Sequence, residues 1–136
     1  MKIDLDHIAL NVVDVDRSVE FYRTIFGFLI ERLDEFKSGQ VPFPSARINE
    51  TTLIDLFPPK MWDDGEGSDG KHNNLNHFCL ALDHLDWQAL RERLTERGIE
   101  IYKDKTINFG AKGDGISMYF RDPDGNEIEA RYYEAG

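Results

Sequence analysis

The chain has 136 residues, a size typical of a single domain with its own hydrophobic core. Its 26 acidic and 16 basic residues give a formal net charge of -10, which disfavours binding to nucleic acid or to an anionic membrane surface. No apolar run approaches the roughly 18 residues of a membrane span, and acidic residues interrupt the N-terminal sequence MKIDLDHIAL, so we expect a cytoplasmic protein without a signal peptide.

The first half of the chain predicts a strand, a helix and three further strands. Residues 3–12 alternate between an apolar side and a small or polar side, which indicates a strand. A helix should follow, because Asp14 or Asp16 suits its N-cap and Gly27 suits its C-terminal end. Strands are then predicted at residues 29–36, 45–48 and 52–57, with turn-forming residues between them. The first module is therefore βαβββ.

The second half repeats this order after a polar connector. Residues 59–74 are rich in Gly, Asp and Asn and show no periodicity, which is typical of a connector. A strand is expected at residues 75–82, and a helix capped by Asp86 should end at Gly98. The remaining strands are predicted at residues 100–103, 116–121 and 126–133.

Two segments between these later strands carry turn signals. The sequence DPDG at residues 122–125 predicts a tight turn. The sequence GAKGDG at residues 110–115 predicts either a mobile lid, because its glycines make it flexible, or an ordinary long hairpin loop.

Equivalent residues of the two halves keep a nearly constant spacing, as a tandem repeat requires. LDHIALNV (5–12) matches LNHFCLAL (75–82), so that His77 lies 70 residues after His7. In the last strand of each half, Glu129 lies 74 residues after Asp55. We therefore predict an α+β fold: one domain of two βαβββ modules, at about 1–58 and 75–134, whose strands form a concave mixed β-sheet cup with the helices outside.

The repeat places two histidines on first strands and two carboxylates on last strands. His7, His77, Asp55 and Glu129 occupy equivalent positions of the two modules, and pseudo-twofold symmetry would bring them together. Neutral imidazole and carboxylate suit Zn, Ni, Co, Mn or Fe, so these four residues are the candidate metal ligands. Asp55 is the weakest candidate, since its side chain is shorter than that of Glu and could reach the ion through water.

Six further residues are predicted to line a substrate pocket beside the metal. Small residues on the inner face of the first strands would leave a hollow, and polar residues near the carboxylates would contact a substrate. The candidates are Asn11, Cys79, Arg47, Tyr119, Arg131 and Tyr133. Cys79 is the single cysteine, so an internal disulfide is excluded, and we interpret it as a wall residue rather than a nucleophile.

Three segments resemble the vicinal oxygen chelate superfamily, which includes glyoxalase I, extradiol dioxygenases, fosfomycin-resistance enzymes and bleomycin-resistance proteins. They are residues 5–28, residues 75–82 and YFRDPDGNEIEARYY at 119–133, and the last is the most specific. The segment GAKGDGISMYFRDPDGN looks particularly like glyoxalase-domain proteins of uncharacterised role. The resemblance implies that His7, His77 and Glu129 fall on the usual ligand positions, and that Asp55 falls where glyoxalase I carries a fourth ligand, normally Glu.

The resemblance implies several functions. One is a divalent-metal-dependent lyase or isomerase whose small-molecule substrate chelates the metal through adjacent oxygens, with Glu129 or Asp55 as the base. Others are an Fe(II) dioxygenase using His7, His77 and Glu129, a fosfomycin-type epoxide-opening enzyme, and a binder of cationic drugs that the net charge would suit. A homodimer is also implied, with each cup formed within one chain or across two.

Overall fold

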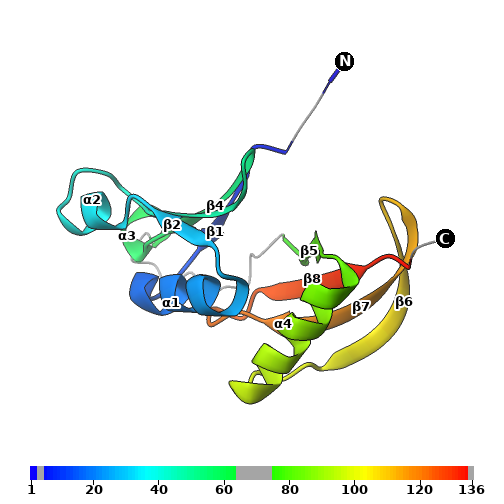
Figure 1. Ribbon diagram of the computed structural model, residues 1–136. Coiled ribbons are helices and arrows are strands. Elements are labelled where there is room, and N and C mark those ends of the chain that lie inside the picture. The colour runs from blue at the N-terminus through cyan, green and yellow to red at the C-terminus, as the bar shows by residue number, and fades with distance from the viewer. Residues whose placement is uncertain (3–4, 64–74, 135–136) are drawn as a thin grey trace. The chain divides into compact units, whose positions relative to one another are not determined.

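The computed structural model describes residues 1–2, 5–63 and 75–134. The chain divides into two compact units, Met1–His72 and Asn73–Gly136, and each unit contains one four-stranded mixed sheet (Figure 1). Most of the predicted connector lies outside the described residues, and its first described residues form a short helix, α3 (Pro59–Trp62). The number of domains stays a prediction.

The first unit contains a sheet covered by one long helix. Its elements are β1 (His7–Asn11), α1 (Val15–Phe26), β2 (Leu29–Glu31), α2 (Leu33–Lys37), β3 (Ser45–Asn49) and β4 (Thr52–Phe57). The strand order is β1-β4-β3-β2, with β1 parallel to β4 and the other neighbours antiparallel. Helix α1 packs against β2, β3 and β4.

The second unit repeats this architecture. Its elements are β5 (Phe78–Ala81), α4 (His84–Glu96), β6 (Lys103–Gly110), β7 (Gly113–Arg121) and β8 (Glu127–Tyr132). The strand order is β5-β8-β7-β6, again with the first strand parallel to the last. Helix α4 packs on β8. The prediction of an α+β fold with two βαβββ modules is confirmed.

Helix α1 has the ends that its sequence predicts. The Asp14 side chain accepts a hydrogen bond from the backbone N–H of Arg17, which satisfies a donor of the first turn. Gly27 ends the helix with φ of 72°, a left-handed conformation that glycine adopts without steric cost. The buried side of the helix includes Tyr22, which is fully buried and makes an edge contact with Phe21. Capping and burial therefore both stabilise this helix.

Helix α4 begins earlier than predicted. The N-cap is Asp83, not Asp86: the Asp83 side chain accepts a hydrogen bond of 2.8 Å from the backbone N–H of Asp86, which already lies in the first turn. On the inner side of the helix, the indole of Trp87 donates to the carbonyl of Ala130 in β8 at 2.8 Å. This hydrogen bond fixes the helix on the strand that carries Glu129.

Several predicted strands have different bounds. The strand predicted at 29–36 stops at Glu31, because Arg32 adopts a left-handed conformation with φ of 63° and the chain turns into α2. The strand predicted at 100–103 instead begins at Lys103 and runs to Gly110. Most of the predicted GAKGDG loop is consequently strand, since Gly110 pairs with Gly113 across a two-residue turn in a β6–β7 hairpin. The loop is therefore short.

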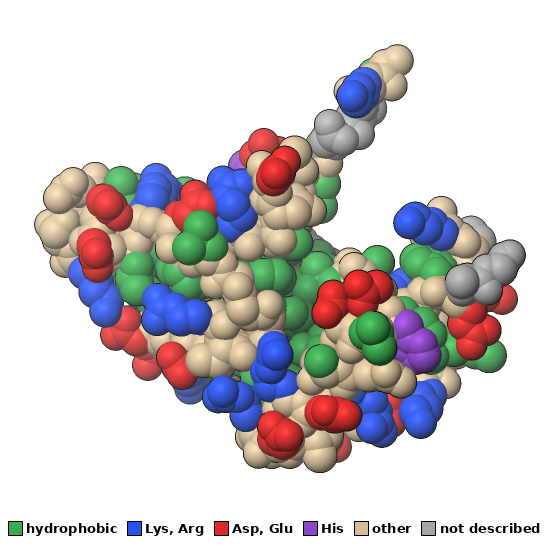
Figure 2. Space-filling model, in the orientation of Figure 1, with side chains coloured by type: hydrophobic (Ala, Val, Ile, Leu, Met, Phe, Trp, Pro, Cys, Tyr) green, Lys and Arg blue, Asp and Glu red, His purple; other side chains and the backbone are tan. Residues whose placement is uncertain are grey.

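Charged side chains are spread over the surface, as the composition suggests. Figure 2 shows acidic and basic side chains interspersed over the face that it presents. None of the helices in the described part of the chain has the length and the apolar character that crossing a bilayer requires.

The position of the α4 cap generates a stability prediction. Asp83→Ala removes the side-chain acceptor for the N–H of Asp86 and should lower the free energy of unfolding by about 1 kcal/mol. Asp86→Ala removes only an acidic residue of the first turn and should cost about 0.5 kcal/mol or less. Urea denaturation of both variants, with Asp83→Asn as a cap-preserving control, checks the order of these effects. A larger loss in Asp86→Ala would contradict it.

Candidate metal centre

In each unit, the last strand carries a carboxylate between residues of its two neighbouring strands. In the first unit, the register places Ala9 beside Asp55, and Asp55 beside Ser45. Leu10, which points to the other face, is buried against the helix side, whereas His7 and Ala9 are exposed. Strand alternation therefore puts His7 and Asp55 on the same open face.

The first unit brings a histidine and a carboxylate close together. The Nε2 atom of His7 lies 3.7 Å from Oδ2 of Asp55. The other carboxylate oxygen, Oδ1, accepts a hydrogen bond of 2.7 Å from the hydroxyl of Ser45. The Nδ1 atom of His7 lies 2.7 Å from a carboxylate oxygen of Asp6. The hydrogen bond with Asp6 and the charge of Asp55 raise the pKa of the exposed His7 imidazole.

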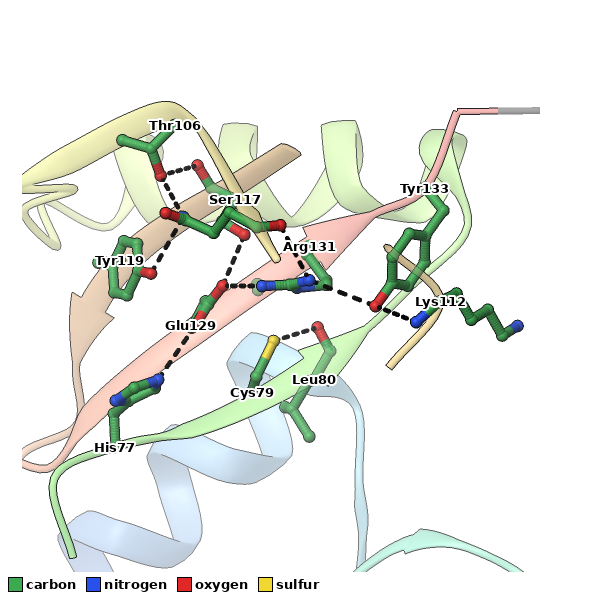
Figure 3. Close-up of polar contacts among 12 residues, drawn as sticks. His77, Cys79, Leu80, Thr106, Lys112, Ser117, Tyr119, Glu129, Arg131 and Tyr133 are labelled. Carbon is green, nitrogen blue, oxygen red and sulfur yellow. Dashed lines mark hydrogen bonds and ion pairs between the residues drawn. The ribbon is translucent and has the colours of Figure 1, made fainter. Parts of the chain in front are cut away.

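The second unit contains the equivalent pair in a tighter arrangement (Figure 3). Nε2 of His77 lies 3.1 Å from Oε1 of Glu129. The other oxygen, Oε2, accepts hydrogen bonds from the Ser117 hydroxyl at 2.7 Å and from Nη2 of Arg131 at 2.6 Å. Burial alone would raise the pKa of Glu129, but these hydrogen bonds outweigh it and hold the pKa below its usual range.

The two histidines are oriented in the same way. Nδ1 of His77 lies 2.6 Å from the side-chain oxygen of Asn76, just as Nδ1 of His7 contacts Asp6. A ring whose Nδ1 proton is donated to a neighbouring oxygen presents the lone pair of Nε2, and this is how proteins commonly orient a metal-binding histidine. In both units that Nε2 faces a buried carboxylate. The donor chemistry of both pairs therefore fits a divalent first-row metal.

Neither pair is a complete metal site. Within residues 1–2, 5–63 and 75–134, no three His, Cys, Asp or Glu side chains form a cluster suited to an ion. Each unit thus supplies one imidazole and one carboxylate. Four ligands require both pairs, and the assignment of His7, Asp55, His77 and Glu129 as ligands stays a prediction.

Two of the predicted pocket residues flank Glu129 in the second sheet. Cys79 pairs with Glu129 on β5, and Tyr119 pairs with it on β7, so all three share one face. Burial raises the pKa of the Cys79 thiol, which favours its neutral form and agrees with a wall residue. Burial and Glu129 raise the pKa of Tyr119 to about 12, so that its hydroxyl remains protonated.

Two other predicted pocket residues have different surroundings. Asn11 is exposed at the end of β1. The guanidinium of Arg47 pairs with Glu31 on β2 and donates to the carbonyls of Asn49 and Glu50, so that it ties β2 to the β3–β4 turn. These contacts give Arg47 a structural role in the described protein, and its contact with a substrate stays a prediction.

Arg131 and Tyr133 complete the set in the second unit. Arg131 is only 4% exposed, and its Nη1 atom donates to the Tyr133 hydroxyl at 3.3 Å. That hydroxyl also accepts the backbone N–H of Lys112 at 3.3 Å. Both residues therefore belong to a network centred on Glu129, and a role in lining a pocket stays a prediction for each.

The residues that support the carboxylates and the histidines were not predicted from the sequence. Ser45 and Ser117 hold one oxygen of Asp55 and Glu129, respectively. Asp6 and Asn76 orient the histidines. Asp6 and Asn76 could have been found from the sequence, because Asp or Asn stands directly before His in both LDH and LNH. No sequence pattern distinguished the serines, because their contacts depend on cross-strand register.

Comparison with known families decides the assignment of the fold. Residues 4–130 match the model of the Glyoxalase/Bleomycin resistance protein/Dioxygenase superfamily. The chain belongs to this superfamily. The resemblance in its strand and turn segments is thereby confirmed over nearly the whole chain.

Individual members of the superfamily are similar at moderate identity. The chain is 29% identical over 129 residues to virulence protein STM3117 of Salmonella typhimurium, covering 95% of the chain and 83% of that protein. The solved structure of STM3117 superposes with a TM-score of 0.76 at 26% identity, covering 98% of the chain and all of the other. Glutathione transferase FosA of Serratia marcescens is 26% identical over 129 residues, covering 92% of the chain and 77% of that protein.

The network around Glu129 generates a titration prediction. The hydroxyl of Tyr133 accepts a backbone hydrogen bond from Lys112 and contacts Arg131, which lower its pKa below the usual value of about 10. Burial and a hydrogen bond to Glu127 raise the pKa of Tyr102 well above that value. The metal-free proteins are titrated with base and followed by ultraviolet absorbance. The difference between the curves of wild type and Tyr133→Phe should have a midpoint below pH 10. The difference between the curves of wild type and Tyr102→Phe should have a midpoint at higher pH.

The same shifts fix the sign of the effect on stability. Because the pKa of Tyr102 is raised by folding, its contribution is fully present below about pH 10 and is lost as pH rises through the folded pKa. The free energy of unfolding of wild type should therefore fall more steeply above pH 10 than that of Tyr102→Phe. Equal midpoints for the two tyrosines would contradict these directions.

Proposed function

We propose that the protein is a divalent-metal-dependent, glyoxalase-like enzyme acting on a small molecule that binds the metal through adjacent oxygens. The observation that carries the proposal is the repetition of one arrangement in both units. In each, Nδ1 of a first-strand histidine contacts the preceding side chain, and Nε2 faces a last-strand carboxylate. A purely structural pair would not need the same histidine orientation twice.

The proposed ligands are His7, His77 and Glu129, with Asp55 as a fourth. Together they provide two nitrogen and two oxygen donors, a set that suits Zn, Ni, Co, Mn or Fe. The two pairs would act together within one chain or across a homodimer. A bound divalent ion would supply Lewis-acid polarisation of the substrate oxygens.

The chain itself supplies the proton-transfer groups and the wall of the site. A carboxylate, Asp55 or Glu129, would take and return the substrate proton as general base and acid. Tyr119, whose raised pKa keeps its hydroxyl protonated at neutral pH, would donate a hydrogen bond to a substrate oxygen. Cys79 and Asn11 lie on the open sheet faces beside the ligands and would leave room for the substrate.

A second candidate function is thiol transfer to an epoxide. The similarity to glutathione transferase FosA favours it, because the relation extends over 92% of this chain. The reaction would use the same ligands but a different substrate. Incubation of the metal-loaded protein with fosfomycin and glutathione, followed by mass spectrometry of the adduct, separates the two: adduct formation supports transfer, and its absence leaves the lyase or isomerase proposal.

Metal binding is the direct test of the proposed ligand set. Wild-type protein, stripped with chelator and titrated with Mn²⁺, Zn²⁺, Ni²⁺, Co²⁺ or anaerobic Fe²⁺, should bind one ion per site. His7→Ala, His77→Ala and Glu129→Ala should each weaken binding by more than the roughly 10–100-fold that loss of an outer contact costs. Calorimetry and elemental analysis measure affinity and stoichiometry.

The control is a histidine outside both pairs. The ring of His84 stacks on Tyr132 at 4.1 Å between centroids. His84→Ala should retain the wild-type metal affinity, whatever its effect on stability. Equal losses in His84→Ala and His77→Ala would contradict the assignment, as would wild-type protein that binds no divalent ion.

Asp55 should contribute less than Glu129 to metal affinity. Its carboxylate lies farther from its histidine, at 3.7 Å against 3.1 Å, and its side chain is one methylene shorter. Asp55→Ala is therefore expected to weaken metal binding by a smaller factor than Glu129→Ala in the same calorimetric titration. Asp55→Asn, which preserves size, separates the charge from the packing. A greater loss in Asp55→Ala than in Glu129→Ala would show that Asp55 is the stronger ligand.

A further inference from the structure

The two oxygens of Glu129 have different surroundings. Oε1 faces the imidazole of His77 at 3.1 Å. Oε2 is held by two donors, the Ser117 hydroxyl and Nη2 of Arg131 (Figure 3). Glu129 is 3% exposed and Arg131 is 4% exposed, so their contact is shielded from water. A charge-assisted hydrogen bond in such surroundings is strong and directional.

Arg131 is itself fixed by the β6–β7 hairpin. Its Nη1 atom donates to the carbonyl of Asn108 and to the hydroxyl of Tyr133, each at 3.3 Å. Gly110 leaves the space that the guanidinium occupies, because a Cβ atom there would lie 1.9 Å from Nη1. The backbone N–H of Lys112 holds Tyr133 in turn. These contacts hold the guanidinium where its Nη2 atom reaches Oε2.

The first unit has no equivalent of this contact. Asp55 accepts a hydrogen bond from Ser45 and pairs with His7, and the described residues bring no Lys or Arg to it. The sequence gives the reason: the residue two positions after Glu129 is Arg131, whereas the residue two positions after Asp55 is the apolar Phe57. The contact with arginine is thus particular to one carboxylate of the repeat.

We infer that Arg131 is a positioning residue that fixes Glu129 as a monodentate metal ligand through Oε1. The inference rests on the proposed function, in which Glu129 is a ligand. The two donors at Oε2 keep the carboxylate from rotating to offer both oxygens to an ion. Arg131 acts through Glu129 and needs no contact with substrate.

Mn²⁺ binding to variants of Arg131 tests the inference. Arg131→Met removes the donor while keeping a long side chain and should weaken Mn²⁺ binding by roughly 10–100-fold in calorimetric titrations. Arg131→Lys keeps the charge but cannot bridge to Tyr133 and Glu129 together, so it should recover part of the loss. Arg97→Met, at an exposed arginine after α4, is the matched control and should bind as wild type.

A spectroscopic measurement separates positioning from a general loss of structure. In infrared difference spectra of Mn²⁺-loaded minus metal-free protein, a monodentate carboxylate shows a wider separation between its antisymmetric and symmetric stretches than a bidentate one. Glu129→Gln assigns the bands. The separation should be wide in wild type and Arg97→Met, and narrower in Arg131→Met.

A milder variant covers the case in which Arg131→Met does not fold. Tyr133→Phe removes only the hydroxyl that holds Nη1, and should weaken Mn²⁺ binding less than Arg131→Met but in the same direction. If Arg131→Met unfolds, the Mn²⁺ affinity and the infrared stretch separation of Arg131→Lys and Tyr133→Phe test the inference instead. Circular dichroism identifies the variants that are folded.

The outcomes distinguish this inference from the proposed function. If wild type binds Mn²⁺ and the folded Arg131 and Tyr133 variants bind it equally well with an unchanged stretch separation, the inference is wrong and the proposed function stands. If wild type binds none of the five ions, both are wrong. If it binds another of them instead of Mn²⁺, that ion replaces Mn²⁺ in these titrations. If Glu129→Gln binds the ion as tightly as wild type, Glu129 is not a ligand, and both the inference and the proposed ligand set are wrong.

Discussion

Parallel pairing between the first and last strands of each module is the constraint on which the candidate site depends. At least one helix and two further strands separate the first strand from the last in each module, yet the last strand pairs directly with the first. The register of that return places Ala9 beside Asp55 and Cys79 beside Glu129. The histidine two residues earlier then shares a face with the carboxylate. Hydrogen bonds of the backbone thus determine which side chains meet.

The second sheet carries an ion pair in a position that normally excludes charge. Separating Arg131 from Glu129 would leave one ion uncompensated in a buried place, which typically costs about 3–5 kcal/mol. The surrounding donors and acceptors, Ser117, Tyr133 and the carbonyl of Asn108, reduce the cost of burial because they replace water at both ions. The pair holds the carboxylate in one orientation, with Oε2 toward the guanidinium and Oε1 toward His77.

Sequence patterns predicted the modules and identified four candidate ligand residues because both follow from local periodicity and from a constant spacing between halves. The spacing identified His7 and His77 as equivalent positions of the two halves, and likewise Asp55 and Glu129, before the strand pairing was known. Features that depend on a single backbone angle or on register were missed: Arg32, whose left-handed conformation ends β2, and Ser117, which reaches Glu129 from the neighbouring strand β7. Alternation also does not reveal that Gly110 on β6 makes room for the guanidinium of Arg131, which lies two strands away on β8.

The contact between Gly110 and Arg131 has a consequence for protein engineering. Hairpin turns are the usual places for inserting tags or exchanging loop sequences, since they tolerate change better than strands do. The β6–β7 turn is an exception, because Gly110 directly before it leaves the space for Arg131, and Lys112 within it donates to Tyr133. Insertions made there would alter the interior of the sheet, whereas Glu50 and Thr51 of the β3–β4 turn contact Arg47 and Asn49 of their own unit.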